Sequence, residues 1–415
     1  MKRNAIFVFF LAFELSVFSQ QIPLKISDYQ FINISENKIK IPADSVPLNN
    51  FFKKIDEVCN SQKGVVNIVH IGGSHIQAGI FSNQIRKNFD FYNGVLAATN
   101  GVFFPFKVAK TNNPTNFNVS YSGSWIAEKS VKRTCQMPLG VNGIAVMTSD
   151  AAAEISVKIF PNEEKHYDFD TLILWGQNVD KDMVMPIIRL DSNNFLFAEY
   201  DSLQQFYKFI FPQKTDTFNI IFCQTDTVPH NFILRGFLPK NSSQGIVYHS
   251  VGVNGATVPS YLGCEFFLSE LSLFPPDLAI FGIGINDAVD VNFKPEKFIE
   301  NYSALIAKIR SISPDCAFIF ITNNDSYRRI SRRKYAVNFN GAKVQKAFYE
   351  LARQNNGGVW DQFEIMGGLC SMRKWQNAKL AKKDKIHFTP QGYILLGNLF
   401  FYAMDSYFQK QKFLY

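Results

Sequence analysis

A serine, a histidine and an aspartate in this sequence are placed where they could carry out acyl transfer. Ser74 follows the apolar run 65–71 and a glycine pair, so it is expected at the turn between a buried strand and a helix. His387 closes a D-x-x-H segment that begins at Asp384. A serine nucleophile needs a base that takes its proton and a group that orients the base. The pattern therefore predicts Ser74 as nucleophile, His387 as base and Asp384 as its orienting group.

Acyl transfer also needs donors for the oxyanion that develops on the substrate carbonyl. The strand 245–251 is followed by Gly255, and the strand 277–282 is followed by Asn286. The carboxyl ends of parallel strands meet at one edge of a sheet, where ligands bind. We therefore expect the oxyanion hole to consist of the backbone N–H groups of Ser74 and Gly255 and the side-chain amide of Asn286.

The elements that must position these residues follow an α/β pattern on both sides of a β-rich stretch. Strands alternate with helices up to about residue 110 and again from residue 245, which predicts a parallel sheet covered on both faces. Between them, short alternating segments separated by turn residues predict a β-sandwich inserted after the first strand of the sheet. The expected organisation is a signal peptide (1–19), an N-terminal extension (20–49), the first part of the α/β domain (50–110), the inserted β-sandwich (111–244) and the second part of the α/β domain (245–415).

The inserted stretch is rich in asparagine, threonine and aromatic residues, including Trp125 and Trp175. Such side chains could bind sugars, although residues of these types more often serve as caps and in core packing. Seven strands are predicted there, at 116–121, 143–148, 153–160, 171–175, 194–197, 216–224 and 231–238.

The N-terminus reads as a targeting segment. A basic start is followed by an apolar stretch too short to span a membrane, with small residues suited to cleavage after Ser19. We therefore expect an exported protein, periplasmic or secreted, without a membrane span. Export permits disulfides, but the six cysteines are widely spaced and their pairing stays open, with free buried thiols favoured for several of them. Their spacing also predicts no metal site.

The chain has a formal net charge of +8, and its densest basic run is 328–334. A solvated helix face is the ordinary interpretation of such a run, and attraction to an anionic polymer is the alternative. Nucleic-acid binding is not expected, because the chain is predicted to be exported and carries no known nucleic-acid module.

Four stretches in order resemble the conserved blocks of the SGNH hydrolases, also called GDSL-like esterases. They are Gly72-Gly73-Ser74-His75, Gly252-Val253-Asn254-Gly255, Gly284-Ile285-Asn286-Asp287 and Asp384-Lys385-Ile386-His387. The resemblance implies a flavodoxin-like three-layer α/β/α fold and a serine esterase that needs neither metal nor cofactor. His75, Asn254 and Asp287, which lie within these blocks, and His249, which lies in a strand near Gly255, could line the site, and capping or packing accounts for His75 as well.

The large insertion resembles that of Gram-negative peptidoglycan O-acetylesterases, in which the inserted module is similar to a jelly-roll carbohydrate-binding module. This implies an acetylated polysaccharide as substrate, with peptidoglycan favoured. Another acetylated glycan, a lipid ester, or a glycan-binding protein with a decayed esterase site are the alternatives. One departure from the family pattern is Gly73, which stands where the family usually has an aspartate. The sequence leaves the oligomeric state open.

Overall fold

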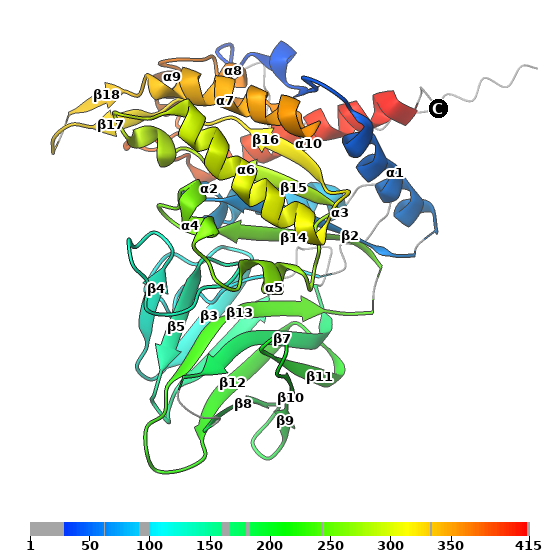
Figure 1. Cartoon of the computed structure of the whole chain (residues 1–415), viewed down its shortest axis with the longest axis vertical. Helices are drawn as coiled ribbons and strands as arrows, with labels where there is room; N and C mark the ends of the chain where they lie inside the picture. The colour runs from blue at the N-terminus through cyan, green and yellow to red at the C-terminus, as the bar shows by residue number, and fades with distance from the viewer. Residues whose placement is uncertain are drawn as a thin grey trace, which may run out of the picture.

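The computed structural model describes residues 29–61, 63–90, 99–159, 167–179, 183–242, 244–332 and 334–412. The predicted signal peptide lies outside these residues. Figure 1 shows an α/β part with a β-rich part beneath it.

The α/β part is built on a six-stranded sheet with the order β1-β19-β16-β15-β2-β14. Its strands are β1 (Ile39–Lys40), β2 (Val65–Gly72), β14 (Gly245–Gly252), β15 (Leu278–Gly282), β16 (Ala317–Ile321) and β19 (Gly358–Trp360). All neighbours are parallel except β1, which pairs antiparallel with β19 at the edge. Without β1, the strands in chain order run 2-1-3-4-5 across the sheet, which is the flavodoxin-like order.

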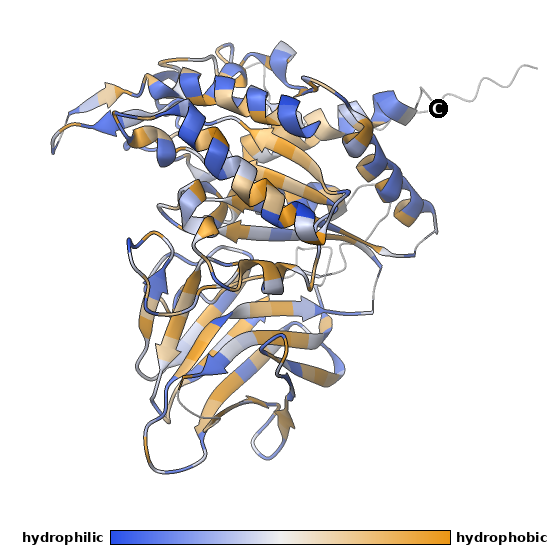
Figure 2. Ribbon diagram, in the orientation of Figure 1, coloured by the Kyte–Doolittle hydropathy of each residue, from blue (hydrophilic) through white to orange (hydrophobic). Residues whose placement is uncertain are grey.

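Helices cover both faces of this sheet because its strands are apolar on both sides. Along β2, Ile68 packs with one core cluster and Val69 with the other, as the alternation of a strand requires. One face carries α1 (Val46–Ser61), α3 (Ile80–Asp90) and α10 (Pro390–Lys412). The other carries α4 (Val258–Leu262), α5 (Phe267–Leu271), α6 (Pro295–Ile312) and α7 (Asn340–Asn355). The short helices α2 (Ser74–Gln77), α8 (Gln362–Ile365) and α9 (Met372–Asn377) follow strand ends or loops. The predicted three-layer α/β/α fold is thus confirmed, and Figure 2 shows the apolar strands between more polar helices.

The inserted part is an antiparallel sandwich of two sheets. One has the order β10-β11-β7-β13-β5-β4 and the other β3-β6-β12-β8-β9. The strands are β3 (Phe117–Ser122), β4 (Ile126–Lys129), β5 (Ile144–Thr148), β6 (Glu154–Ile159), β7 (Phe169–Asn178), β8 (Val184–Arg189), β9 (Phe195–Phe197), β10 (Glu199–Asp201), β11 (Phe206–Thr215), β12 (Thr217–Gln224) and β13 (Phe232–Lys240). All seven predicted strands are present, and β4, β8, β10 and β11 were not predicted. Both β8 and β11 contain a proline, which weakens a strand pattern in the sequence.

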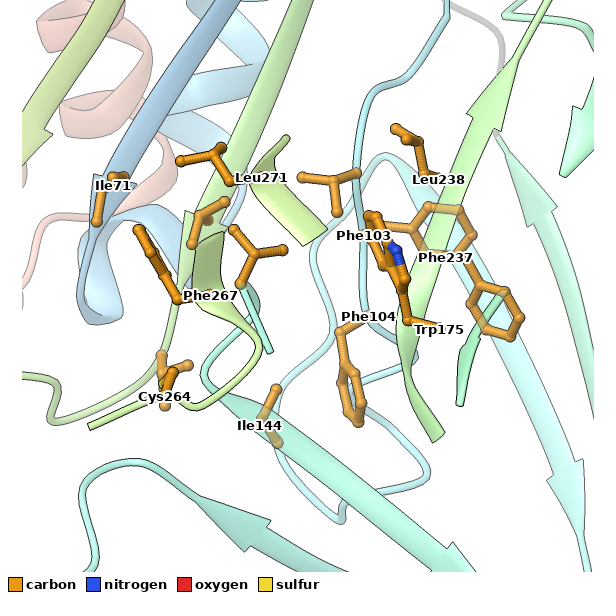
Figure 3. Packing of buried hydrophobic residues seen from close by; sticks show 14 of the residues in the cluster. Ile71, Phe103, Phe104, Ile144, Trp175, Phe237, Leu238, Cys264, Phe267 and Leu271 are labelled. Carbon is orange, nitrogen blue, oxygen red and sulfur yellow. The ribbon is translucent and has the colours of Figure 1, made fainter. Parts of the chain in front are cut away.

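The two parts share one apolar core. Phe103 pairs with Phe237 of β13 through backbone hydrogen bonds, while Ile71 of β2 belongs to the same cluster. Figure 3 shows Phe267 and Leu271 of α5 between the two parts. A buried ion pair crosses the same junction, with Arg235 Nε donating to Glu270 Oε1 at 2.6 Å. The insertion therefore packs against the domain that carries it through both apolar and charged contacts.

Two predicted elements differ from the structure. The helix expected after the turn at Ser74 is interrupted at Gly79, which has a φ of +78° and separates α2 from α3. A Cβ there would lie 2.6 Å from Pro114, so this position has room only for glycine. The basic run 328–334 is not a helix face. It lies on a β-hairpin formed by β17 (Tyr327–Arg329) and β18 (Tyr335–Val337).

Within the described part of the chain, no helix is both long and apolar enough to cross a membrane. All six cysteines are free thiols, and Cys59, Cys264 and Cys316 are buried as expected for packing residues.

Candidate active site

Ser74, His387 and Asp384 form a continuous chain of hydrogen bonds. The Ser74 hydroxyl lies 2.8 Å from His387 Nε2, and His387 Nδ1 lies 2.9 Å from Asp384 Oδ2. In the neutral tautomer with the proton on Nδ1, the imidazole donates to Asp384 and accepts from Ser74. This is the order of contacts that lets a histidine take a proton from a serine while a carboxylate stabilises the resulting imidazolium.

The loop before α10 fixes the orientation of both His387 and Asp384. Asp384 Oδ1 accepts the backbone N–H groups of Ile386 and His387, each at 2.9 Å, which leaves Oδ2 for the imidazole. Lys385 has a φ of +58°, a left-handed conformation that closes this short turn. Burial acts to raise the pKa of Asp384, but the hydrogen bonds from His387 and the two N–H groups outweigh it and hold that pKa below its usual range. Asp384 is thus an anion when His387 takes up a proton.

Ser74 lies where the strand order of the sheet reverses. It is the first residue of α2, directly after β2, and β2 lies between β14 and β15. Chain connections leave the sheet in opposite directions at such a point and open a crevice beyond the strand ends. The carbonyl of Gly73 accepts the N–H groups of Ile76 and Gln77, which fixes the turn that presents the serine.

The expected oxyanion-hole groups lie around this turn. Asn286 Nδ2 donates to the carbonyl of Ala256 at 2.9 Å, and a Cβ on Gly73 would lie 3.4 Å from the same nitrogen. Among the residues that the structure describes, none accepts a hydrogen bond from the backbone N–H of Ser74 or Gly255. Two unused N–H groups and the second N–H of Asn286 are therefore available to an incoming oxygen. Gly255 has a φ of +84°, a conformation that favours glycine.

Hydrogen bonds join the strand-end loops that carry these groups. Gln77 Oε1 accepts the N–H of Asn254 at 2.7 Å, and the Tyr261 hydroxyl donates to the carbonyl of Gly72 at 2.7 Å. The sequence reasoning did not identify Gln77 or Tyr261. Gln77 lies one helical turn after Ser74, and this spacing was the available signal. Asn254, expected near the site, lies beside it and contacts Asn112 through its side chain.

His75 also lies beside the site, as the sequence resemblance implied. Its ring centroid is 5.3 Å from that of His387, and its Nδ1 lies 2.8 Å from the hydroxyl of Tyr393. Burial, with a smaller contribution from the neighbouring His387, lowers the pKa of His75 to about 3. His75 is therefore an uncharged neighbour of His387. Tyr393 is a site residue that the sequence reasoning missed.

Two of the residues expected to line the site do other work. His249 contacts the backbone of Val102 and the side chain of Asn67 and stacks on Phe274, so it is a core residue and the expectation was wrong. Its position within β14, three residues before the strand end, keeps it from the crevice. Asp287 points toward α4, where Oδ1 accepts the N–H of Val258 at 3.2 Å. Burial raises the pKa of Asp287 to about 6.

Gly73, the departure from the family pattern, adopts a conformation that does not require glycine. Its φ is −109°, and a Cβ built on it would meet its nearest neighbour at 3.4 Å, an ordinary contact. Gly72 differs, since a Cβ there would lie 2.2 Å from Ile76. The first glycine of the pair is thus sterically required and the second is not.

A loop of the inserted part reaches the site. Val131 approaches Gly255, with its Cγ1 3.7 Å from where a Cβ on that glycine would lie. Beside it lies a cavity of about 690 Å³ between the two parts of the chain. Its lining includes Arg133 and Gln136 from the insertion and Thr257 from the α/β domain. The crevice is therefore bordered by both parts.

One family model and several solved structures are similar to this chain or to parts of it. Residues 229–395 match the model of the GDSL-like Lipase/Acylhydrolase family. A solved peptidoglycan O-acetylesterase is similar in fold over 90% of this chain and 99% of its own, with a TM-score of 0.70 and 17% identity. An acetyl xylan esterase covers 39% of this chain and 81% of its own, with a TM-score of 0.31 and 16% identity. A family two carbohydrate esterase from Cellvibrio japonicus covers 70% and 98%, with a TM-score of 0.27 and 9% identity.

No curated protein sequence matches this chain significantly. The predicted resemblance to GDSL-like esterases is nevertheless confirmed, and so is the prediction of an esterase or acylhydrolase. The first structure includes a counterpart of almost the whole chain, the insertion among it, so the two-part architecture is common to both proteins.

Proposed function

We propose that this GDSL-like esterase is exported and removes O-acetyl groups from peptidoglycan, with Ser74 as its nucleophile. The observation that carries the proposal is the chain of hydrogen bonds from Ser74 through His387 to Asp384, with bonds of 2.8 and 2.9 Å. Export is supported by the N-terminal targeting pattern of the sequence.

The reaction proceeds in two halves. In the first, Ser74 Oγ attacks the ester carbonyl while His387 Nε2 takes its proton, and Asp384 stabilises the imidazolium. The tetrahedral oxyanion accepts hydrogen bonds from the N–H groups of Ser74 and Gly255 and from Asn286 Nδ2. The C–O bond to the sugar then breaks, the sugar oxygen receives the proton from His387, and acetyl-Ser74 remains.

In the second half, water attacks acetyl-Ser74 and His387 takes a proton from that water. A second tetrahedral oxyanion forms in the same hole and collapses with cleavage of the bond to Ser74 Oγ. The serine oxygen recovers its proton from His387, and acetate leaves. No group beyond the chain and water is needed for either half.

The choice of substrate rests on the insertion and on the crevice. One similar structure, which covers 90% of this chain and so includes a counterpart of the insertion, is a peptidoglycan O-acetylesterase. The cavity of about 690 Å³ beside Gly255 offers room for sugar units next to the acetylated one. Residues of both the insertion and the α/β domain line this cavity, so both parts could contact a polymeric substrate.

Turnover of p-nitrophenyl acetate by a Ser74→Ala protein tests the nucleophile. We expect kcat to fall on the order of 10⁴-fold or more, because the variant lacks the hydroxyl that contacts His387 Nε2. Ser269→Ala changes an exposed serine of α5 and serves as the matched control. Undiminished turnover in a folded Ser74→Ala protein would contradict the proposal.

Acetate release from polymers tests the substrate. Purified protein is incubated with O-acetylated peptidoglycan and, separately, with acetyl-xylan at equal concentrations of ester. We expect kcat/KM to be higher on peptidoglycan by roughly tenfold or more, the difference that about 1.4 kcal/mol of specific contacts produces. A preference for acetyl-xylan would keep the esterase chemistry and reject peptidoglycan as substrate.

A further inference from the structure

A β-hairpin carries the densest basic run of the sequence away from the body of the protein. Strands β17 and β18 pair only with each other, and Figure 1 shows them projecting from the α/β part. The tip is a tight turn in which the Ile330 N–H donates to the carbonyl of Lys334. Arg329 donates to the carbonyls of Ser331 and Arg332, so its guanidinium braces the turn. The shape of the hairpin is therefore held by its own residues.

The base of the hairpin is joined to the loop that carries Asp384 and His387. The Tyr327 N–H donates to the carbonyl of Lys385 at 3.2 Å. The ammonium of Lys385 lies 4.8 Å from the ring centroid of Tyr327 and 5.7 Å from that of Tyr335, within the range of a cation–π contact. The projecting strands thus begin next to the loop that carries Asp384 and His387.

Several cations lie on this loop and on the hairpin that contacts it, and we call them together the basic face. Its members are Arg328, Arg329, Arg332, Lys334, Lys382, Lys383 and Lys385. Over the described ranges of the chain, no carboxylate lies within ion-pair distance of any of them. A surface cluster of like charges without counter-ions attracts anionic ligands and repels cationic ones.

We propose that the basic face binds the carboxylate groups of the peptide side chains of peptidoglycan and so guides the polymer to Ser74. This inference rests on the proposed function for the identity of the polymer. The glycan strand of peptidoglycan carries short peptides with free carboxylates, which a row of arginines and lysines can contact as the strand enters the crevice. A neutral acetylated glycan such as xylan offers no such groups.

The distribution of apolar residues favours a polymer over a lipid surface. Two large apolar side chains are exposed on or beside the hairpin, Ile330 at the tip (67%) and Phe339 after its base (68%). They lie at opposite ends of the hairpin and form no common patch. A basic segment that inserts into a membrane presents a contiguous apolar face together with its charges. The cations of the basic face instead lie on the hairpin and on the loop that carries Asp384 and His387.

Binding to peptidoglycan sacculi tests the inference in a Ser74→Ala background, where the substrate persists. The hairpin variant combines Arg329→Gln, Arg332→Gln and Lys334→Gln. The control combines Lys53→Gln, Lys158→Gln and Lys410→Gln, which removes the same charge from three exposed and separate positions. Co-sedimentation at low salt gives the dissociation constant, and thermal unfolding checks that both proteins are folded. We expect the hairpin variant to bind about tenfold more weakly than the control.

Chemical changes to the sacculi separate this inference from the proposed function. Amidation of the peptide carboxylates should remove the difference between hairpin variant and control. Removal of the O-acetyl groups with mild base should leave that difference in place, because the carboxylates remain. If the esterase proposal fails, the protein with native Ser74 will release no acetate, and the binding result stands by itself.

Three outcomes would overturn the inference. The first is equal binding of the hairpin variant and the control to sacculi. The second is a difference in binding that survives amidation. The third is hairpin-dependent binding to phosphatidylglycerol vesicles combined with hairpin-independent binding to sacculi, which would assign the basic face to a membrane. In the wild-type Ser74 background, the supporting result is a matching fall in the ratio of activity on sacculi to activity on p-nitrophenyl acetate.

Discussion

The rings of His75 and His387 lie side by side, with centroids 5.3 Å apart, and only one of the two histidines contacts Ser74. His75 is held by the hydroxyl of Tyr393, and burial lowers its pKa to about 3. A charged neighbour would oppose the imidazolium that His387 must become during the reaction. His75 therefore lets the site hold two imidazoles without this repulsion.

Tyr393→Phe tests the positioning of His75. The change leaves His75 Nδ1 without its partner, and we expect a loss of about 1 kcal/mol in the free energy of unfolding. We also expect kcat for p-nitrophenyl acetate to fall roughly fivefold with KM little changed, since a shift of a few tenths of an ångström in His75 moves His387 as well. Tyr402→Phe, on the same helix α10, is the matched control. A change in KM alone would argue for a role in substrate binding instead.

Gly72 and Gly73 should respond differently to the same substitution. Gly72→Ala places a Cβ 2.2 Å from Ile76, so we expect a loss of about 2 kcal/mol or more in unfolding free energy. Gly73→Ala places its Cβ at an ordinary contact distance of 3.4 Å, so we expect a change within about 1 kcal/mol. Denaturant unfolding measures both. Equal effects would mean that the turn before Ser74 is constrained by something other than this contact.

Gly73→Asp restores the residue that the family usually has. The space around Gly73 admits the side chain, and the new carboxylate would lie next to Asn286 Nδ2. We expect the protein to fold and its kcat/KM for p-nitrophenyl acetate to change by less than about tenfold, because Asp is no member of the serine–histidine–aspartate chain. Loss of activity beyond about a hundredfold would show that the oxyanion hole of this chain is adapted to glycine.

Asp287 should make stability depend on pH. Burial raises its pKa in the folded protein to about 6, whereas an unfolded aspartate titrates near 3.9. Between these values the folded state binds a proton that the unfolded state has lost, so stability falls as pH rises from about 4 to 6 and stays lower above 6. Asp287→Asn removes this term and should stabilise the protein at pH 8 by up to about 3 kcal/mol. Thermal unfolding at pH 4, where we expect no such gain, is the internal control.

Loss of Arg235 should lower the stability of the protein more than loss of Arg353. Its pair with Glu270 is fully buried at the junction of the two parts, while the pair of Arg353 with Glu350 is exposed. Arg235→Met leaves a buried carboxylate uncompensated, for which we expect a loss of about 3–5 kcal/mol. Arg353→Met should cost about 1 kcal/mol or less. A small effect at Arg235 would indicate that water reaches Glu270 when the arginine is removed.

The sequence alone determined the fold class and the identity of the residues in the serine–histidine–aspartate chain. Apolar strands that end at glycines are local patterns, and a carboxylate three residues before an imidazole reaches it within one turn, so Asp384 and His387 could be paired without knowing the fold. The insertion was visible for the same reason, since period-two alternation differs from the α/β pattern on either side.

Only the tertiary structure decided which residues support this chain. Tyr393 contacts His75 across more than 300 positions of sequence, and Gln77 joins the loop of Asn254 across the insertion. Such contacts depend on how strands and helices are ordered in space, which no local pattern encodes. The same holds for His249, which the sequence places in a strand near Gly255. The register of that strand puts His249 in the core. The need for glycine at position 79 likewise comes from its contact with Pro114, a residue 35 positions later that only the fold brings beside it.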